Sequence, residues 1–289
     1  MSFNFKVIVV SLLIIIAIPM AGLRYYKKHS RPKYVPPPPK EEINITIIPG
    51  WNLRDVAKDW VKQNIIKDEK ELYALLGQPA YNYKANRKEA PVVFFDNVPA
   101  DQKFTLLSTK PDYVSYEGYL FPDTYRVYAD AKPEDVLKKV FLNLEDKITA
   151  EMREEIVKQK KSFFQILNMA ALVEREAKTP EDMAMVADIF WRREKMNWAL
   201  QSCASVNYIT GKNDPGVLNV DREIDSAFNT YKYPGLPLGP VGNPSMKGIT
   251  AVLYPQKNNY WYFMSGTDGT MHYAKTLDEH NINVAKYLR

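Results

Sequence analysis

Hydrophobic residues recur along this chain at spacings that predict mostly helices with a few short strands. In residues 43–77, alternating isoleucines indicate a strand, a Pro-Gly pair indicates a turn, and two amphipathic runs indicate two helices. Leu53, Val56, Ala57 and Trp60 recur at helical spacing in the first of these helices. We therefore predict a small subdomain here with the order strand, helix, helix.

Two longer helices are predicted further along the chain. Residues 132–148 place five apolar side chains on one helical face, which is typical of an amphipathic helix. Residues 163–177 are apolar nearly all round, so this helix is expected to be buried. The next helix begins soon afterwards, because Thr179 suits an N-cap and Pro180 suits the first helical position.

The C-terminal part of the chain predicts a shaped loop followed by a hairpin. Residues 229–245 contain four prolines and three glycines, which indicate an ordered loop rather than a helix. Residues 258–265 read as a strand, and the sequence "GTDG" predicts a turn into a second strand. Residues 78–112 form a connector of strands or irregular structure. The predicted fold class is α+β.

The N-terminal residues predict a membrane anchor. Residues 7–23 are an uncharged run of 17 residues, at the short end of what spans a bilayer. We interpret residues 1–31 as a short cytoplasmic end, one uncleaved transmembrane helix and a basic flank, although the small residues of "PMAGL" leave cleavage open. Residues 32–42 are a proline-rich, extended linker. The positive-inside rule taken alone would leave the rest of the chain in the cytoplasm.

The distribution of charge argues against a nucleic-acid-binding protein. The net charge is +5, but seven of the 39 Lys and Arg residues lie in residues 1–40, which contain no acidic residue. The rest of the chain therefore has 32 basic residues against 34 acidic ones, with no basic run suited to phosphate binding. Cys203 is the only cysteine and the three histidines are scattered, so we predict neither a metal site nor a cofactor.

The sequence "ALVEREA", residues 171–177, places two glutamates at the end of the predicted buried helix. Glu174 and Glu176 are two residues apart, so they point about 200° away from each other and cannot share one task. Partial burial and the negative end of a helix dipole both raise the pKa of a carboxyl group, which suits a general acid. Periodicity does not choose between the two. The alternative is that arginines pair with both, and the candidates are Arg175, Arg192 and Arg193.

Five blocks of the chain resemble, in order and spacing, the MltG/YceG-like family of endolytic murein transglycosylases. They are "EGYLFPDTY", "ALVEREA", "VADIFWRREKMNWALQSCASVNYITG", "FNTYKYPGLPLGPVGNPS" and "YWYFMSGTDGTMHYAKTLDEHNINVAKY". These blocks lie within residues 113–289, which the resemblance identifies as a mixed α+β catalytic domain. The anchor, the linker and the unit at 43–77, which is similar to LysM modules, follow the family's order. That unit either contacts glycan or serves only for packing.

The resemblance implies a bacterial enzyme tethered to the inner membrane, with its catalytic domain on the outer side. Its substrate would be nascent peptidoglycan glycan strands, cut non-hydrolytically at the MurNAc-GlcNAc bond to leave 1,6-anhydroMurNAc ends. The second glutamate of the family's E-x-E block is catalytic, which corresponds to Glu176, and Glu174 would be a supporting residue. Penicillin-binding synthases are the partners that the resemblance implies.

Nine further polar residues in these blocks are candidates for substrate binding, each with a purely structural role as its alternative. They are Glu117, Asp123, Thr124, Gln201, Ser202, Asn207, Asn229, Thr230 and Tyr231. Where relatives carry Asp-Pro, this chain has Cys203-Ala204, which leaves the role of position 203 open.

Two rival functions remain at the level of sequence. One is a non-catalytic scaffold that binds peptidoglycan and recruits synthases, with structural glutamates. The other is a hydrolytic muramidase, which would be favoured if Glu117 or Asp123 lay opposite Glu176 at the distance of a carboxylate pair.

Overall fold

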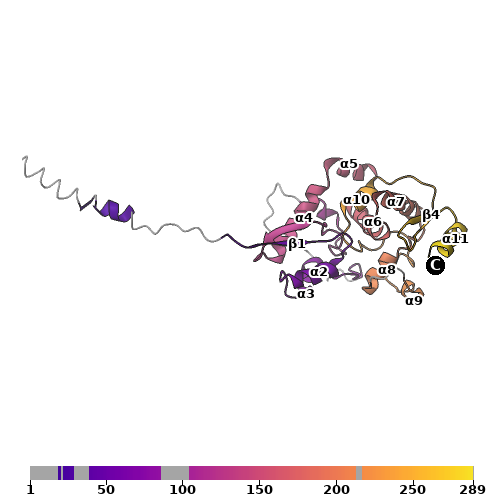
Figure 1. Cartoon of the computed structure of the whole chain (residues 1–289), viewed down its shortest axis with the longest axis horizontal. Coiled ribbons are helices and arrows are strands. Elements are labelled where there is room, and N and C mark those ends of the chain that lie inside the picture. Colours follow the sequence, from indigo (N-terminus) through magenta and orange to yellow (C-terminus); the bar gives the residue numbers. More distant parts are fainter. Residues whose placement is uncertain (1–18, 21, 29–38, 86–103, 213–216, 289) are drawn as a thin grey trace, which may run out of the picture. The chain divides into compact units, whose positions relative to one another are not determined.

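The computed structural model describes residues 19–20, 22–28, 39–85, 104–212 and 217–288 (Figure 1). The chain divides into two compact units, residues 1–40 and residues 41–289. Most of the predicted membrane span and of the proline-rich linker lies outside the described residues, as does the middle of the connector. Among the helices that are described, none has the length and hydropathy needed to cross a bilayer.

Within residues 41–289 the described elements are mostly helices with two small antiparallel sheets, which confirms the α+β prediction. Strand β1 (Glu42–Thr46) pairs with β2 (Thr124–Tyr128), with Glu42 opposite Tyr128. Strand β3 (Tyr262–Ser265) pairs with β4 (Met271–Ala274) and forms the predicted C-terminal hairpin.

The strand–helix–helix order predicted for residues 43–77 is present as β1, α2 (Leu53–Lys62) and α3 (Glu69–Leu76). Asn52 and Asp55 form a capping box that begins α2. The partner of β1 is β2, about eighty residues later in the chain. This small unit therefore shares a sheet with the segment that precedes the central helices.

The central helices are α4 (Pro133–Lys147), α5 (Ala150–Lys158), α6 (Phe163–Glu176), α7 (Pro180–Lys195) and α10 (Met246–Leu253). Helix α6 packs against both α7 and α10, which also pack against each other (Figure 1). Its residues from Ile166 to Val173 are all buried, as the apolar run predicts, and the polar exception, Asn168, donates a hydrogen bond to the carbonyl oxygen of Pro237 at 2.7 Å. The predicted N-cap of α7, Thr179, accepts a hydrogen bond from the backbone N–H of Asp182.

Four further elements are described in residues 41–289. They are the 3₁₀ turn η2 (Leu107–Thr109) and the helices α8 (Cys203–Thr210), α9 (Asn219–Arg222) and α11 (Leu277–Tyr287). Helix α11 packs on β3 and β4, and α8 contacts both α6 and α9. The segment of α8 and the hairpin are thereby brought to the last turn of the buried helix.

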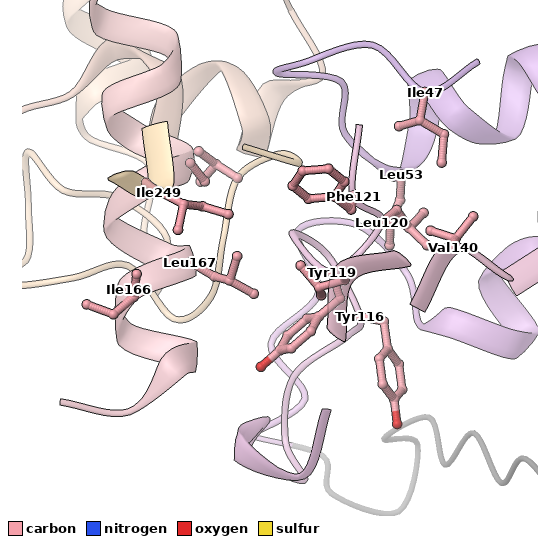
Figure 2. Packing of buried hydrophobic residues seen from close by; sticks show 14 of the residues in the cluster. Ile47, Leu53, Tyr116, Tyr119, Leu120, Phe121, Val140, Ile166, Leu167 and Ile249 are labelled. Carbon is pink, nitrogen blue, oxygen red and sulfur yellow. The ribbon is translucent and has the colours of Figure 1, made fainter. Parts of the chain in front are cut away.

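A single hydrophobic cluster joins the N-terminal elements to the central helices. Figure 2 shows side chains of residues 116–121 between two groups, one from the N-terminal elements and α4 and one from α6 and α10. Tyr119 and Leu120 are fully buried there. The segment before β2 is therefore the part of the core that contacts both the N-terminal elements and the central helices.

Gly118, in the middle of this shared segment, leaves no room for a side chain beside Pro240. Its φ is +87°, and a Cβ atom added to it would lie 2.6 Å from Cβ of Pro240. The proline ring cannot rotate away as a flexible side chain can. Glycine is required here both for the left-handed backbone and for the contact with the proline-rich loop.

We predict that Gly118→Ala lowers the free energy of unfolding by more than about 2 kcal/mol, since left-handed backbone strain and overpacking add together. Gly235→Ala is the matched control, because its φ is +85° but its added Cβ would meet nothing within 4 Å. Urea unfolding of both variants measures the difference. Equal losses of stability in the two variants would show that the Pro240 contact does not matter.

Candidate active site

Glu176 is the last residue of α6, and its side chain is partly buried at the junction with α8. The chain turns into extended backbone at Ala177, so α6 cannot continue past the glutamate. Glu176 Oε1 accepts a hydrogen bond from the hydroxyl of Ser202, the N-cap residue of α8. The site therefore joins the end of a buried helix to the start of another.

The protein environment makes Glu176 a weaker acid than a free glutamate. Burial raises the pKa of its carboxyl group, whereas the Ser202 hydrogen bond and the positive charges of Arg175 and Arg193 lower it. Burial outweighs these opposing effects, so the pKa lies above the ordinary value. A carboxyl group that keeps its proton at higher pH is suited to donate it to a leaving group.

Ser202 is held in place by buried hydrogen bonds from the loop before the proline-rich segment. Its backbone N–H donates to Thr230 Oγ1 at 3.0 Å, and the backbone N–H of Gln201 donates to the Thr230 carbonyl at 3.0 Å. The Ser205 hydroxyl lies 2.8 Å from the same Thr230 oxygen. Ser202 and Thr230 are each only 1% exposed. The hydroxyl that contacts Glu176 thus has little freedom.

Asn229 organises this loop from within. Its side-chain amide donates to the carbonyl oxygens of Arg222 and Ile224, both at 2.8 Å, and its Oδ1 accepts from the backbone N–H of Tyr231. The Tyr231 hydroxyl lies 3.1 Å from Cys203 Sγ. Burial raises the pKa of Tyr231, and Cys203 and the negative charge of Glu176 add to this effect.

Arg193 fixes the segment before Ser202 to the C-terminal hairpin. This buried guanidinium donates to the carbonyl oxygens of Leu200 at 2.8 Å and Trp261 at 2.5 Å. It also packs against the rings of Trp198 and Tyr262, at 5.1 Å and 5.6 Å from their centroids. Trp198, Trp261 and Tyr262 were not predicted as site residues, because they come from segments that only the folded chain brings together.

Arg192, which the sequence offered as a partner for the glutamates, forms an ion pair with Asp188 instead, at 2.9 Å. It also packs over the ring of Trp261 at 4.4 Å from the centroid. Arg192 therefore stabilises the join between α7 and the hairpin.

Glu174 belongs to a different network, as the two-residue spacing predicts. Its Oε2 accepts hydrogen bonds from the backbone N–H of Ser245 at 3.1 Å and from the Ser245 hydroxyl at 2.7 Å. Ser245 is the N-cap of α10, and a Cβ added to Gly248 would lie 2.7 Å from the same carboxylate oxygen. Glu174 thus anchors the start of α10 against the end of α6.

Glu117 anchors another helix start. Both of its carboxylate oxygens lie 3.1 Å from the backbone nitrogen of Leu53, the first residue of α2. Burial raises its pKa to about 8, against the opposing effects of Leu53, Tyr208 and Arg54. Tyr208 lies six residues after Ser202 on α8, so Glu117 contacts the opposite end of that helix from Glu176.

Asp123 and Thr124 lie at the β1–β2 sheet. Asp123 accepts hydrogen bonds from the Asn143 side chain at 3.1 Å and the Thr124 N–H at 2.8 Å, and these bonds and Lys147 lower its pKa despite the effect of burial. The Thr124 hydroxyl lies 3.0 Å from that of Thr46. In the part of the chain that the structure describes, no hydrogen bond or ion pair joins these residues to Glu176.

The structure therefore separates the predicted site residues into groups. Around Glu176 it gathers Gln201, Ser202, Asn229, Thr230 and Tyr231, with Asn207 buried further along α8. Gln201 is exposed at a positive φ of 58°. Within the described ranges, no cluster of three or more His, Cys, Asp or Glu residues could hold a metal ion.

A buried helix that ends in a glutamate of raised pKa, held by a fixed hydroxyl, defines a site for acid–base chemistry. The YceG-like family matches residues 29–286, and the chain belongs to this family. It is similar to the endolytic murein transglycosylase of Bacillus subtilis, with 39% identity over 60% of this chain and 48% of that protein. The chain thus spans about half the length of that relative.

Two further relatives agree with this assignment. The endolytic murein transglycosylase of Streptococcus pneumoniae is 31% identical over 60% of this chain and 32% of that protein. The crystal structure of a YceG-like protein from Listeria monocytogenes matches with a TM-score of 0.65 and 30% identity, over 83% of this chain and 74% of that one.

We predict that the stability of the protein falls as the pH rises through about 8, because Glu117 keeps its proton in the folded state. The unfolded chain releases this proton near the ordinary value of 4.5, so between these values the folded state binds more protons and loses stability with rising pH. Glu117→Gln keeps a neutral acceptor for Leu53, and its unfolding free energy should vary less between pH 6 and pH 9.

Urea unfolding at several pH values measures this difference. The exposed Glu154→Gln is the control, and it should follow the wild-type curve. If Glu117→Gln also runs parallel to wild type, Glu117 does not titrate in this range and the prediction is wrong.

Proposed function

We propose that this protein is an endolytic lytic transglycosylase that cleaves peptidoglycan glycan strands with Glu176 as the single acid–base catalyst. The observation that carries the proposal is the raised pKa of Glu176 together with its hydrogen bond from the buried Ser202. The similarity to the endolytic murein transglycosylases of Bacillus subtilis and Streptococcus pneumoniae supports the substrate and the reaction. The bond proposed for cleavage lies between N-acetylmuramic acid and N-acetylglucosamine.

The proposed reaction uses one carboxyl group twice. Protonated Glu176 first donates its proton to the glycosidic oxygen, and the bond from this oxygen to C1 of the muramyl residue breaks. The carboxylate then accepts the proton of the muramyl C6 hydroxyl, whose oxygen forms a new bond to C1. A 1,6-anhydro end results, water is not consumed, and Glu176 is protonated again. Ser202 stabilises the carboxylate between the two steps by donating its hydroxyl hydrogen.

The positions of the other carboxylates favour this single-residue mechanism over hydrolysis by a carboxylate pair. Glu174 is engaged by Ser245 at the start of α10, and Glu117 by Leu53 at the start of α2. Each of these two carboxylates holds the start of a helix in place. The hydrolytic muramidase and the non-catalytic scaffold remain the competing functions that the first experiment separates.

We extend the proposal to the location of the protein. The uncharged run at residues 7–23 would anchor it in the bacterial inner membrane, and the proline-rich linker would hold residues 41–289 on the outer side. Nascent strands are made at that surface, so penicillin-binding synthases are the proposed partners. The LysM-like unit at residues 43–77 would then lie near the same strands.

We predict that Glu176→Gln abolishes strand cleavage, because the amide can neither donate a proton to the leaving oxygen nor accept one. Mass spectrometry of uncrosslinked glycan strands after incubation should detect 1,6-anhydromuramyl ends with wild type only. Glu174→Gln is the matched control, since its amide oxygen can still accept from Ser245, and it should retain cleavage.

The other possible results each favour one of the two competing functions. Reducing ends would identify a hydrolase. Binding without cleavage by folded wild-type protein would favour the scaffold.

We predict that Ser202→Ala shifts the alkaline limb of the pH–rate profile upward by about one to two pH units, because the lost hydrogen bond stabilises the carboxylate by about 1.5–3 kcal/mol. The maximal rate should fall as well, since the carboxyl group loses its fixed orientation. Ser245→Ala removes the equivalent hydroxyl from Glu174 and should leave the limb in place. If the alkaline limb of Ser202→Ala is not shifted, Ser202 does not act on Glu176 as proposed.

A further inference from the structure

A surface hollow lies at the opposite end of α8 from Glu176. It is an open cavity of about 620 Å³, within the size range of ligand pockets. Three segments form it: Ala80 and Asn82 in the turn after α3, Ile209 near the end of α8, and the loop at residues 224–227 with Tyr233. Nothing in the mechanism derived above uses it.

The walls of this cavity combine aliphatic surface with a single charge. Ile209 and Ile224 provide the larger apolar side chains of the lining, and Asp225 is its only charged residue. Asp225 Oδ1 accepts a hydrogen bond from the Tyr233 hydroxyl at 2.5 Å. Its other oxygen, Oδ2, accepts no hydrogen bond from the described residues. This combination suits an aliphatic chain that ends in a positively charged amino group.

The cavity is linked to the candidate active site through one rigid loop. Asn229 donates to the carbonyl oxygen of Ile224 on the cavity side, and the next residue, Thr230, holds Ser202 on the Glu176 side. Helix α8 runs between the two sites, and the seven residues from Ser202 to Ile209 correspond to about 10 Å of helix rise. A polymer bound at Glu176 can therefore extend a substituent to the cavity.

We propose that this cavity binds the peptide substituent of the glycan strand, with Asp225 paired to an amino group of that peptide. This inference rests on the proposed function. The N-acetylated sugars of the strand carry no cationic group, whereas a diamino acid of the peptide carries one on an aliphatic chain. A sugar subsite would be expected to present an open aromatic face, but Tyr233 is the only aromatic residue in the lining and its hydroxyl is bound to Asp225.

The test compares two substrates with the full-length protein: uncrosslinked strands that carry their peptides, and the same strands after an amidase has removed them. Asp225→Asn should raise KM for peptide-bearing strands about two- to fivefold, the size expected for a solvent-accessible ion pair. It should leave kcat, and KM for stripped strands, unchanged. Asp225→Lys should raise KM for peptide-bearing strands further, because it places like charges together.

Glu223→Gln is the matched control, since it removes the same charge from an exposed position of the same loop that does not line the cavity. Equal effects of Asp225→Asn and Glu223→Gln, or equal effects on both substrates, would overturn the proposal. If wild type cleaves neither substrate, the proposed function fails. Fluorescence anisotropy with a labelled peptide-bearing strand fragment then still decides whether Asp225→Asn weakens binding.

Discussion

The burial of α6 is the constraint on which the rest of the structure depends. Its apolar surface packs against α7 and α10, so its last turn, with two glutamates, is brought to the edge of the core. Burying a charged carboxylate is unfavourable unless it gains partners. Glu174 and Glu176 gain them from opposite sides, the first from the start of α10 and the second from Ser202.

Three carboxyl groups in residues 113–289 differ in the groups that donate hydrogen bonds to them. Glu117 and Glu174 each accept a hydrogen bond from a backbone N–H at the start of a helix, and this contact ties each of them to the fold. Glu176 lies instead at a helix C-terminus, where the dipole disfavours its charge. Its hydrogen bond comes from a single hydroxyl. We therefore propose Glu176, rather than Glu117 or Glu174, as the group that transfers a proton.

The loop that contains Asn229 and Thr230 also has side chains of two kinds, those that hold the loop together and those that face outward. Its buried amide and hydroxyl are used for internal hydrogen bonds, which makes the loop rigid and positions Ser202. Polar residues predicted to contact substrate can thus lie one step away from Glu176, as Thr230 does, which holds Ser202 against the Glu176 carboxyl group. The outer side of the same loop provides Asp225 and Tyr233, which line the cavity at the far end of α8 from Glu176.

The sequence by itself determined much of the local structure and offered Glu174 and Glu176 as the candidate carboxyl groups. Apolar periodicity and caps predicted α2, α4, α6, the start of α7 and the C-terminal hairpin, because these depend on neighbours within a few residues. Strand β2 was missed, although Tyr125 and Val127 alternate with exposed residues, because its partner β1 is about eighty residues away. The spacing of Glu174 and Glu176 correctly predicted that the two side chains lie in separate hydrogen-bond networks. Only the tertiary structure decided which side chains surround Glu176, since Ser202, which Thr230 holds in place, and Arg193 come from distant segments that no local pattern brings together.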